Sequence, residues 1–211
     1  GAPETHLALL GHLALAANAL VIAPRYPLAP EHPFPAAAMA IEDVIGEAMA
    51  WREEVGQAAL GGDSAGGTQA QEALSSLLKQ RAGPPALVLY SPAVNMHPGR
   101  PVPAADDLLF PEILLHRIGA AYAPDADPKD PRLCPIIGEY PGAPPTLIQC
   151  VKDEFLEEDS EGIAARLADF GADVRLEKAR EMPHAWQFLA GSSPLADSAV
   201  ARAGAFLEAN S

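Results

Sequence analysis

Ser64 is the side chain in this sequence best suited to nucleophilic chemistry. It lies within residues 62–66, which read G-D-S-A-G, a G-x-S-x-G pattern between a short apolar segment and a segment with helical periodicity. A serine on so tight a strand-to-helix turn adopts strained backbone angles, and the flanking glycines leave room for strand and helix to approach each other. The N–H groups at the helix start can stabilise an oxyanion. The pattern therefore predicts a nucleophilic serine.

Two other glycine-rich motifs differ from this one. A phosphate-binding P-loop requires a lysine after its last glycine, whereas Thr68 and Gln69 follow Gly67. A dinucleotide-binding loop requires G-x-G-x-x-G after the first strand, and the spacing here is different. An ordinary glycine-rich turn is the remaining alternative.

A serine nucleophile needs a base to accept its proton and an acid to orient that base, in the chain order Ser, acid, His. Asp153 follows an apolar segment at 146–151, and no histidine other than His184 lies beyond it. We therefore predict Asp153 as the acid and His184 as the base. The rival acids are Glu154, Glu157, Glu158 and Asp159. We interpret these rivals as a solvated acidic face at a helix start.

No metal and no cofactor is expected. The other histidines show no pairing such as H-E-x-x-H. Cys134 and Cys150 have neither metal-ligand nor redox spacing, and we interpret them as buried free thiols.

Helical and strand-like segments alternate along the chain. Helical spacing covers about 7–18, 36–54, 68–80, 112–122, 160–170 and 194–210, and apolar or alternating strand segments cover 19–23, 58–60, 86–90, 146–151 and 174–177. This alternation predicts an α/β fold with a mostly parallel sheet and helices on both faces, in a single domain over 1–211. The long proline-rich connection at 98–131 is typical of a lid or binding segment.

Charge and hydropathy exclude some partners. The formal net charge of −14 argues against nucleic acid and anionic membrane surfaces, and it fits a small uncharged substrate. No apolar run approaches the roughly 18 residues of a membrane span.

Several stretches of the chain carry a family resemblance. They are P-E-T-H at 3–6, Y-P-L-A-P-E-H-P-F-P-A at 26–36, G-D-S-A-G-G at 62–67, D-E-F-L at 153–156 and M-P-H at 182–184. Together they resemble the bacterial hormone-sensitive-lipase-like esterases of the α/β-hydrolase fold, from the first residue nearly to the last. The resemblance implies hydrolysis of short- to medium-chain carboxylic esters through an acyl-enzyme, without metal or cofactor.

Further expectations concern the acyl pocket, the oligomeric state and the location of the protein. The lid at 98–131 is expected to cover the acyl pocket. Its expected lining residues are Leu108, Leu109, Phe110, Ile113 and Leu114. A homodimer and a cytoplasmic location are further expectations.

The sequence departs from the family pattern in two places. Pro27 stands where the family has an arginine in Y-R-L-A-P-E. The family's H-G-G-G oxyanion loop and its first three strands would precede Gly1, and the sequence does not contain them. This leaves the Ala65 N–H as the oxyanion donor that can be named. We expect the native protein to have an N-terminal segment absent from this sequence.

Other functions remain open at this point. An amidase, thioesterase or peptidase on the same scaffold would use the same serine, acid and histidine. A non-catalytic ligand-binding protein is a different class, and plant gibberellin receptors that resemble this family have lost the base histidine. The presence of His184 favours an enzyme. The absence of the H-G-G-G loop keeps a receptor-like binding protein or an impaired enzyme as an alternative.

Overall fold

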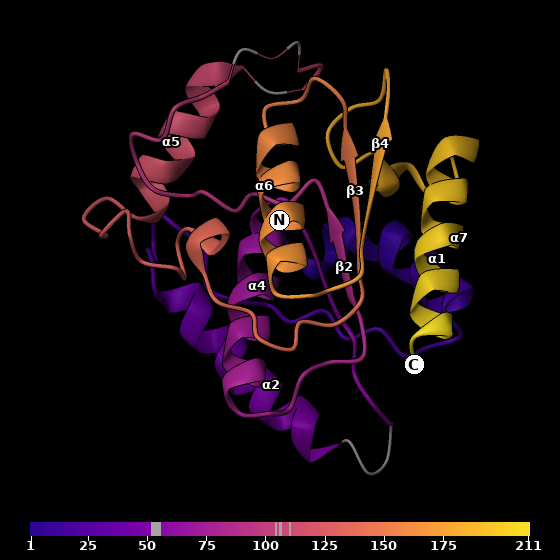
Figure 1. The fold of residues 1–211 in the computed structure, drawn as a ribbon. Coiled ribbons are helices and arrows are strands. Elements are labelled where there is room, and N and C mark those ends of the chain that lie inside the picture. The colour runs from indigo at the N-terminus through magenta and orange to yellow at the C-terminus, as the bar shows by residue number, and fades with distance from the viewer. Residues whose placement is uncertain (52–55, 104, 106, 110) are drawn as a thin grey trace.

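A computed structural model describes residues 1–51, 56–103, 105, 107–109 and 111–211 (Figure 1). Its sheet has the order β1-β2-β3-β4, with each neighbouring pair parallel. The strands are β1 (Leu60–Asp63), β2 (Leu87–Tyr90), β3 (Thr146–Val151) and β4 (Val174–Ala179). Because every strand runs in the same direction, all their carboxyl ends meet at one edge of the sheet. The predicted parallel α/β architecture is confirmed.

Helices connect these strands. The α-helices of the described residues are α1 (Leu7–Ala16), α2 (Ala36–Ala50), α4 (Ala65–Lys79), α5 (Glu112–Tyr122), α6 (Glu157–Asp169) and α7 (Pro194–Ala209). Three short 3-10 helices accompany them, η1 (Pro3–His6), η2 (Pro135–Ile137) and η3 (Trp186–Leu189). The second predicted helix extended to residue 54, and residues 52–55 lie outside the described part of the chain.

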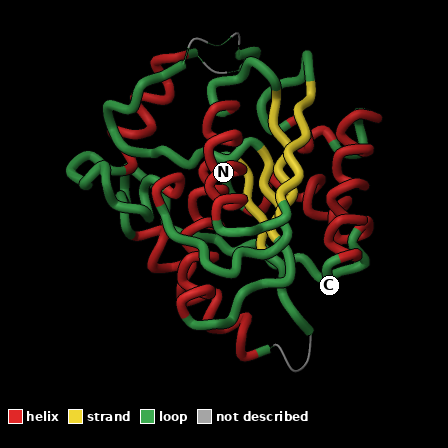
Figure 2. The backbone as a smooth tube through the Cα atoms, in the orientation of Figure 1, coloured by secondary structure: helices red, strands yellow, loops and turns green. Residues whose placement is uncertain are grey.

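Two helical layers enclose the sheet, with α4 and α6 on one face and α1 and α7 on the other (Figures 1 and 2). Successive side chains of β2 show why both faces are covered. Leu87 and Leu89 pack with α4 and α6, whereas Val88 and Tyr90 pack with α1 and α7. A strand buried on both faces reads as a continuous apolar run, which is how β2 and β3 appear in the sequence.

One predicted strand is wrong. Residues 19–23 were expected as a buried strand, but they are not in the sheet, and the side chains of Leu20 and Ile22 are 72% and 48% exposed. An apolar run becomes a strand only where another strand satisfies its backbone N–H and C=O groups. Among the strands of the described sheet, β1 pairs with β2 alone, and its other edge is not paired with residues 19–23.

The expected lid segment connects β2 to β3 and contains α5. A buried ion pair anchors its first part, because Arg100 Nη1 lies 2.8 Å from Asp159 Oδ2 near the start of α6. The expected lining residues Leu108, Leu109 and Ile113 are 53–65% exposed, and Leu114 is half-buried. Phe110 lies outside the described residues.

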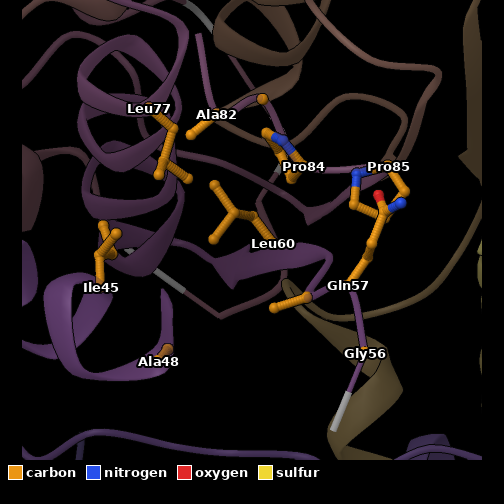
Figure 3. A pocket seen from close by; sticks show the side chains of 11 residues that line it. Ile45, Ala48, Gly56, Gln57, Leu60, Leu77, Ala82, Pro84 and Pro85 are labelled. Atoms are coloured by element: carbon orange, nitrogen blue, oxygen red, sulfur yellow. The ribbon is translucent and has the colours of Figure 1, made fainter. Parts of the chain in front are cut away.

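A small apolar hollow lies at the amino end of β1 (Figure 3). Ile45, Leu60, Leu77, Pro84 and Pro85 contribute to its wall. Leu60 begins β1, whereas Ser64 follows its end, so this hollow lies at the opposite end of the strand from the predicted nucleophile. None of the described helices is both long and apolar enough to cross a bilayer.

Glu72 is an acid placed in the interior of the helical layer. It lies on α4 and is 7% exposed, one turn from Gln69, whose amide donates a 2.9 Å hydrogen bond to Tyr122 Oη. Burial raises the pKa of Glu72 to about 7, and the attraction of Arg132 offsets only part of this effect. The folded protein therefore binds a proton here that the unfolded chain has lost at neutral pH.

We predict that Glu72→Gln flattens the pH dependence of stability. A raised carboxyl pKa contributes stability below pH 4.5 that is lost as pH rises through about 7. At pH 8 the variant should gain about 1 kcal/mol over the wild type after allowance for solvent screening, with little difference at pH 4.5. Urea denaturation at both pH values measures this. The exposed Glu208→Gln is the control, and an equal gain in both variants would contradict the prediction.

Candidate active site

Ser64 adopts the strained conformation that its motif predicts. Its φ and ψ angles are 50° and −123°, a left-handed region that non-glycine residues rarely occupy. Two backbone hydrogen bonds hold it there, because the Ser64 N–H donates to the Tyr90 carbonyl at 3.0 Å and the Ala93 N–H donates to the Ser64 carbonyl at 2.9 Å. The turn after β1 is thus fixed to the chain that leaves β2.

Gly62, two residues before the serine, is required by close packing. A Cβ atom added to Gly62 would lie 2.2 Å from the carbonyl oxygen of Gly66. Gly67 is equally restricted, since its Cβ would lie 2.5 Å from Cβ of Pro92. The strand and helix therefore approach each other as closely as the G-x-S-x-G pattern implies.

Ala65 is the first residue of α4, directly after the serine. The first N–H groups of an α-helix have no carbonyl partner within the helix, and they carry the positive end of its dipole. The Thr68 hydroxyl donates to the Ala93 carbonyl and fastens this helix start to the loop after β2. The Ala65 N–H is thus one of the unpaired donors at the helix start, directly after Ser64.

His184 lies in the loop after β4 and forms a buried pair with an acid. Its Nδ1 atom lies 2.8 Å from Oε2 of Glu154, and the two side chains are 5% and 2% exposed. The other carboxylate oxygen, Oε1, accepts the Val151 N–H at 2.9 Å. Glu154 is therefore held from both sides, and one of its oxygens faces the imidazole.

Asp153, the acid predicted from the sequence, does not pair with His184. Asp153 has a left-handed φ of 68°, and its side chain is 62% exposed, 3.9 Å from Lys152 Nζ. Its N–H donates to Glu157 Oε2 at 2.6 Å, so the backbone is fixed with the Asp153 side chain outside. The structure does not bring Asp153 to His184, and it brings Glu154 there instead.

A signal for this difference exists in the sequence. The residues after Glu154 are Phe155 and Leu156, both almost fully buried, so the chain has already turned into the core at this point. Asp153 instead follows Lys152 on the solvent side of the turn. A carboxylate next to a buried apolar pair is the better candidate for a buried ion pair than one next to a lysine.

A buried network of side-chain amide hydrogen bonds supports the His184 loop. The Gln187 amide donates to Gln149 Oε1 at 3.0 Å, and Gln149 in turn donates to the Ala199 carbonyl of α7 and to Glu177, each at 3.0 Å. Both glutamines are fully buried, so these hydrogen bonds form in a low-dielectric interior. The network joins the loop to β3, β4 and the C-terminal helix.

Ser64, Glu154 and His184 follow β1, β3 and β4, so all three lie at the carboxyl edge of the parallel sheet. A family model described as alpha/beta hydrolase fold matches residues 1–188. The crystal structure of an esterase from the bacterial hormone-sensitive lipase family superposes with a TM-score of 0.88 at 34% identity, and covers 100% of this chain and 72% of that one. The chain belongs to this hormone-sensitive-lipase-like family of α/β-hydrolases.

Relatives of this hydrolase have consistent names. An acetyl-hydrolase of Streptomyces hygroscopicus is 34% identical over 219 residues, which span 98% of this chain and 71% of the relative. An esterase of Acinetobacter venetianus is 36% identical over 182 residues, which span 83% of this chain and 59% of the relative. The predicted family and enzyme class are confirmed, and the hydrolase is a carboxylic ester hydrolase.

We predict that Gly62→Ala destabilises this hydrolase by about 1–3 kcal/mol, because the new methyl group would overlap a backbone carbonyl that the strand and helix hold in place. The matched control is Gly66→Ala, whose Cβ would meet its nearest neighbour, Asp63 Oδ1, at an ordinary 3.8 Å. Urea denaturation monitored by circular dichroism compares the two variants. Equal stability of Gly62→Ala and Gly66→Ala would contradict the account of the turn.

Proposed function

We propose that this hydrolase is a serine carboxylesterase for short- to medium-chain acyl esters, with Ser64 as nucleophile, His184 as base and Glu154 as the acid. The observation that carries the proposal is the buried His184–Glu154 pair, which lies at the same sheet edge as the strained Ser64. A histidine with one ring nitrogen on a carboxylate presents the other as a proton acceptor, which is the arrangement that a serine nucleophile requires.

The first half of the reaction forms an acyl-enzyme. Ser64 Oγ attacks the ester carbonyl carbon while His184 Nε2 accepts the hydroxyl proton. The Ala65 N–H donates to the oxyanion of the tetrahedral intermediate. Glu154 keeps the proton on Nδ1 of His184 and stabilises the imidazolium. His184 then protonates the leaving alkoxide oxygen, the C–O bond breaks, and the acyl group remains on Ser64.

The second half releases the acid. Water attacks the acyl carbon while His184 Nε2 accepts a proton from it. Collapse of the second tetrahedral intermediate breaks the bond to Ser64 Oγ, which recovers the proton from His184. The products are an alcohol and a carboxylic acid, and the enzyme is returned unchanged.

Three observations favour small uncharged esters as substrates. Relatives carry the names acetyl-hydrolase and esterase. The lid segment presents Leu108, Leu109 and Ile113, apolar side chains suited to an acyl chain. The net charge of −14 repels the carboxylate product after hydrolysis. A homodimer, a cytoplasmic location and the acyl-pocket lining stay predictions from the sequence.

The direct test is hydrolysis of p-nitrophenyl acetate and p-nitrophenyl butyrate by the wild type and by Ser64→Ala. Turnover that falls by at least about 10³-fold in the variant is expected, because only background catalysis remains without the nucleophile. Labelling by a phosphonate ester should occur in the wild type alone, as measured by intact mass. Turnover that persists in Ser64→Ala would overturn the assignment of the nucleophile.

A separate pair of variants identifies the acid. Glu154→Gln should lower kcat by about 10²–10⁴-fold, because a neutral amide cannot stabilise the imidazolium or fix the imidazole tautomer. Asp153→Asn is the matched control, since Asn tolerates a left-handed backbone and the Asp153 side chain is largely exposed. Its kcat should change by less than about threefold. The reverse result would restore Asp153 as the acid.

A further inference from the structure

His6 connects three segments that are far apart in the sequence. Its Nε2 atom lies 3.3 Å from Oδ1 and 3.4 Å from Oδ2 of Asp63, the residue directly before the nucleophile. Its ring packs edge-to-face on Phe188, four residues after His184, with 4.6 Å between ring centroids. Its Nδ1 atom lies 2.9 Å from the Ala2 carbonyl. One imidazole therefore contacts the nucleophile turn, the base loop and the N-terminal segment.

The partners of His6 determine its protonation state. The Asp63 carboxylate and the Ala2 carbonyl are both acceptors, so each ring nitrogen has to donate a proton to make its contact. The Thr5 hydroxyl lies 2.8 Å from Nδ1 and already donates to the Ala2 carbonyl at 2.7 Å, which leaves it an acceptor towards the ring. An imidazolium with both nitrogens protonated satisfies all of these contacts, whereas a neutral ring leaves one acceptor facing another.

A cross-connection is needed because the sheet alone does not fix the nucleophile to the base. Ser64 follows β1 and His184 follows β4, the two outer strands of the sheet formed by the described residues. With neighbouring strands about 4.8 Å apart, β1 and β4 are separated by roughly 14 Å. The base loop must return across this distance to approach the serine. The contact of His6 with both Asp63 and Phe188 restrains it at this point.

We propose that the His6 imidazolium is a positioning residue, which holds the Ser64 turn and the His184 loop at a fixed separation through Asp63 and Phe188. The inference rests on the esterase function proposed above. His6 transfers no proton to substrate in this role. Loss of its charge weakens the bond to Asp63 and lets the two loops separate, and a misplacement of about 1 Å can cost about 10²-fold in rate.

The charges around His6 give this role a pH signature. The hydrogen bond to Asp63 raises the pKa of His6, and burial opposes this effect. Asp63 is also faced by the Tyr26 and Tyr90 phenols, whose pKa values burial raises above the ordinary tyrosine value. The imidazolium is thus present below its raised pKa and lost above it. The kcat profile should fall on the alkaline side as His6 loses its proton.

The experiment combines NMR titration with kinetics. Histidine ring resonances, assigned through His6→Gln, give the pKa of His6 in the wild type and in Asp63→Asn. We measure kcat and KM for p-nitrophenyl butyrate against pH for the same proteins. The hydrolysis seen with Ser64→Ala is subtracted as background. His12→Gln, an exposed histidine of the adjoining helix α1, is the matched control.

Three results are expected together. The pKa of His6 falls by about one unit in Asp63→Asn, and the alkaline limb of kcat moves to lower pH with it. His6→Gln lowers kcat about tenfold, removes that limb and leaves KM within about twofold, because His6 does not touch substrate. His12→Gln keeps the wild-type profile. If His6 had only a structural role, His6→Gln would lower the thermal stability without changing the pH dependence of kcat.

The contrary results separate the two proposals. An active wild type whose alkaline limb persists in His6→Gln, or does not move in Asp63→Asn, overturns the positioning role and leaves the esterase function standing. If His6→Gln does not fold, Asp63→Asn alone tests the positioning role, through the fall of the His6 pKa and the matching shift of the alkaline limb of kcat. A wild type without Ser64-dependent turnover overturns the esterase function and the positioning role with it.

Discussion

The strained backbone at Ser64 is the constraint on which the rest of the site depends. A positive φ at a serine is unfavourable by itself, and here the surrounding chain imposes it. Hydrogen bonds from β2 and the loop beyond it fix both ends of the residue, and the packing of Gly62 against Gly66 leaves no space for a relaxed turn. Ser64, the proposed nucleophile, is therefore held half-buried at the carboxyl edge of the sheet by the parallel strands and the start of α4.

The same device recurs in the two other loops of the site. Asp153, beside the proposed acid, and Ala185, beside the proposed base, also have left-handed backbone angles although neither is a glycine. Asp153 lies two residues after β3, and Ala185 lies in the loop after β4; their neighbours Glu154 and His184 meet in the interior. Strain at such positions is tolerated where the surrounding packing determines the conformation, which the buried amides of Gln149 and Gln187 provide beneath the base loop.

Much of this arrangement could be predicted from the sequence. The nucleophile motif, strand 146–151 and helix 112–122 are governed by local patterns, and the structure has those two elements at the predicted residues. We predicted Asp153 beside His184, whereas Glu154 lies there, because a left-handed turn decides which of two adjacent carboxylates faces inward. The apolar Phe155 and Leu156 signal this inward turn, whereas composition and periodicity do not record a φ angle. The strand predicted at 19–23 failed for another reason, since an apolar run specifies a strand only together with its partner.

The two ends of the lid segment lie together, and this has a consequence for evolution. The Met96 N–H donates to the Leu133 carbonyl at 3.0 Å, so the two ends of the segment meet in a backbone hydrogen bond beside the Arg100–Asp159 pair. The entropy of closing a loop grows only with the logarithm of its length, by about 0.6 kcal/mol per doubling. Insertions and deletions between these ends are therefore thermodynamically inexpensive. Substrate range can diverge there while the acid and base loops keep their geometry.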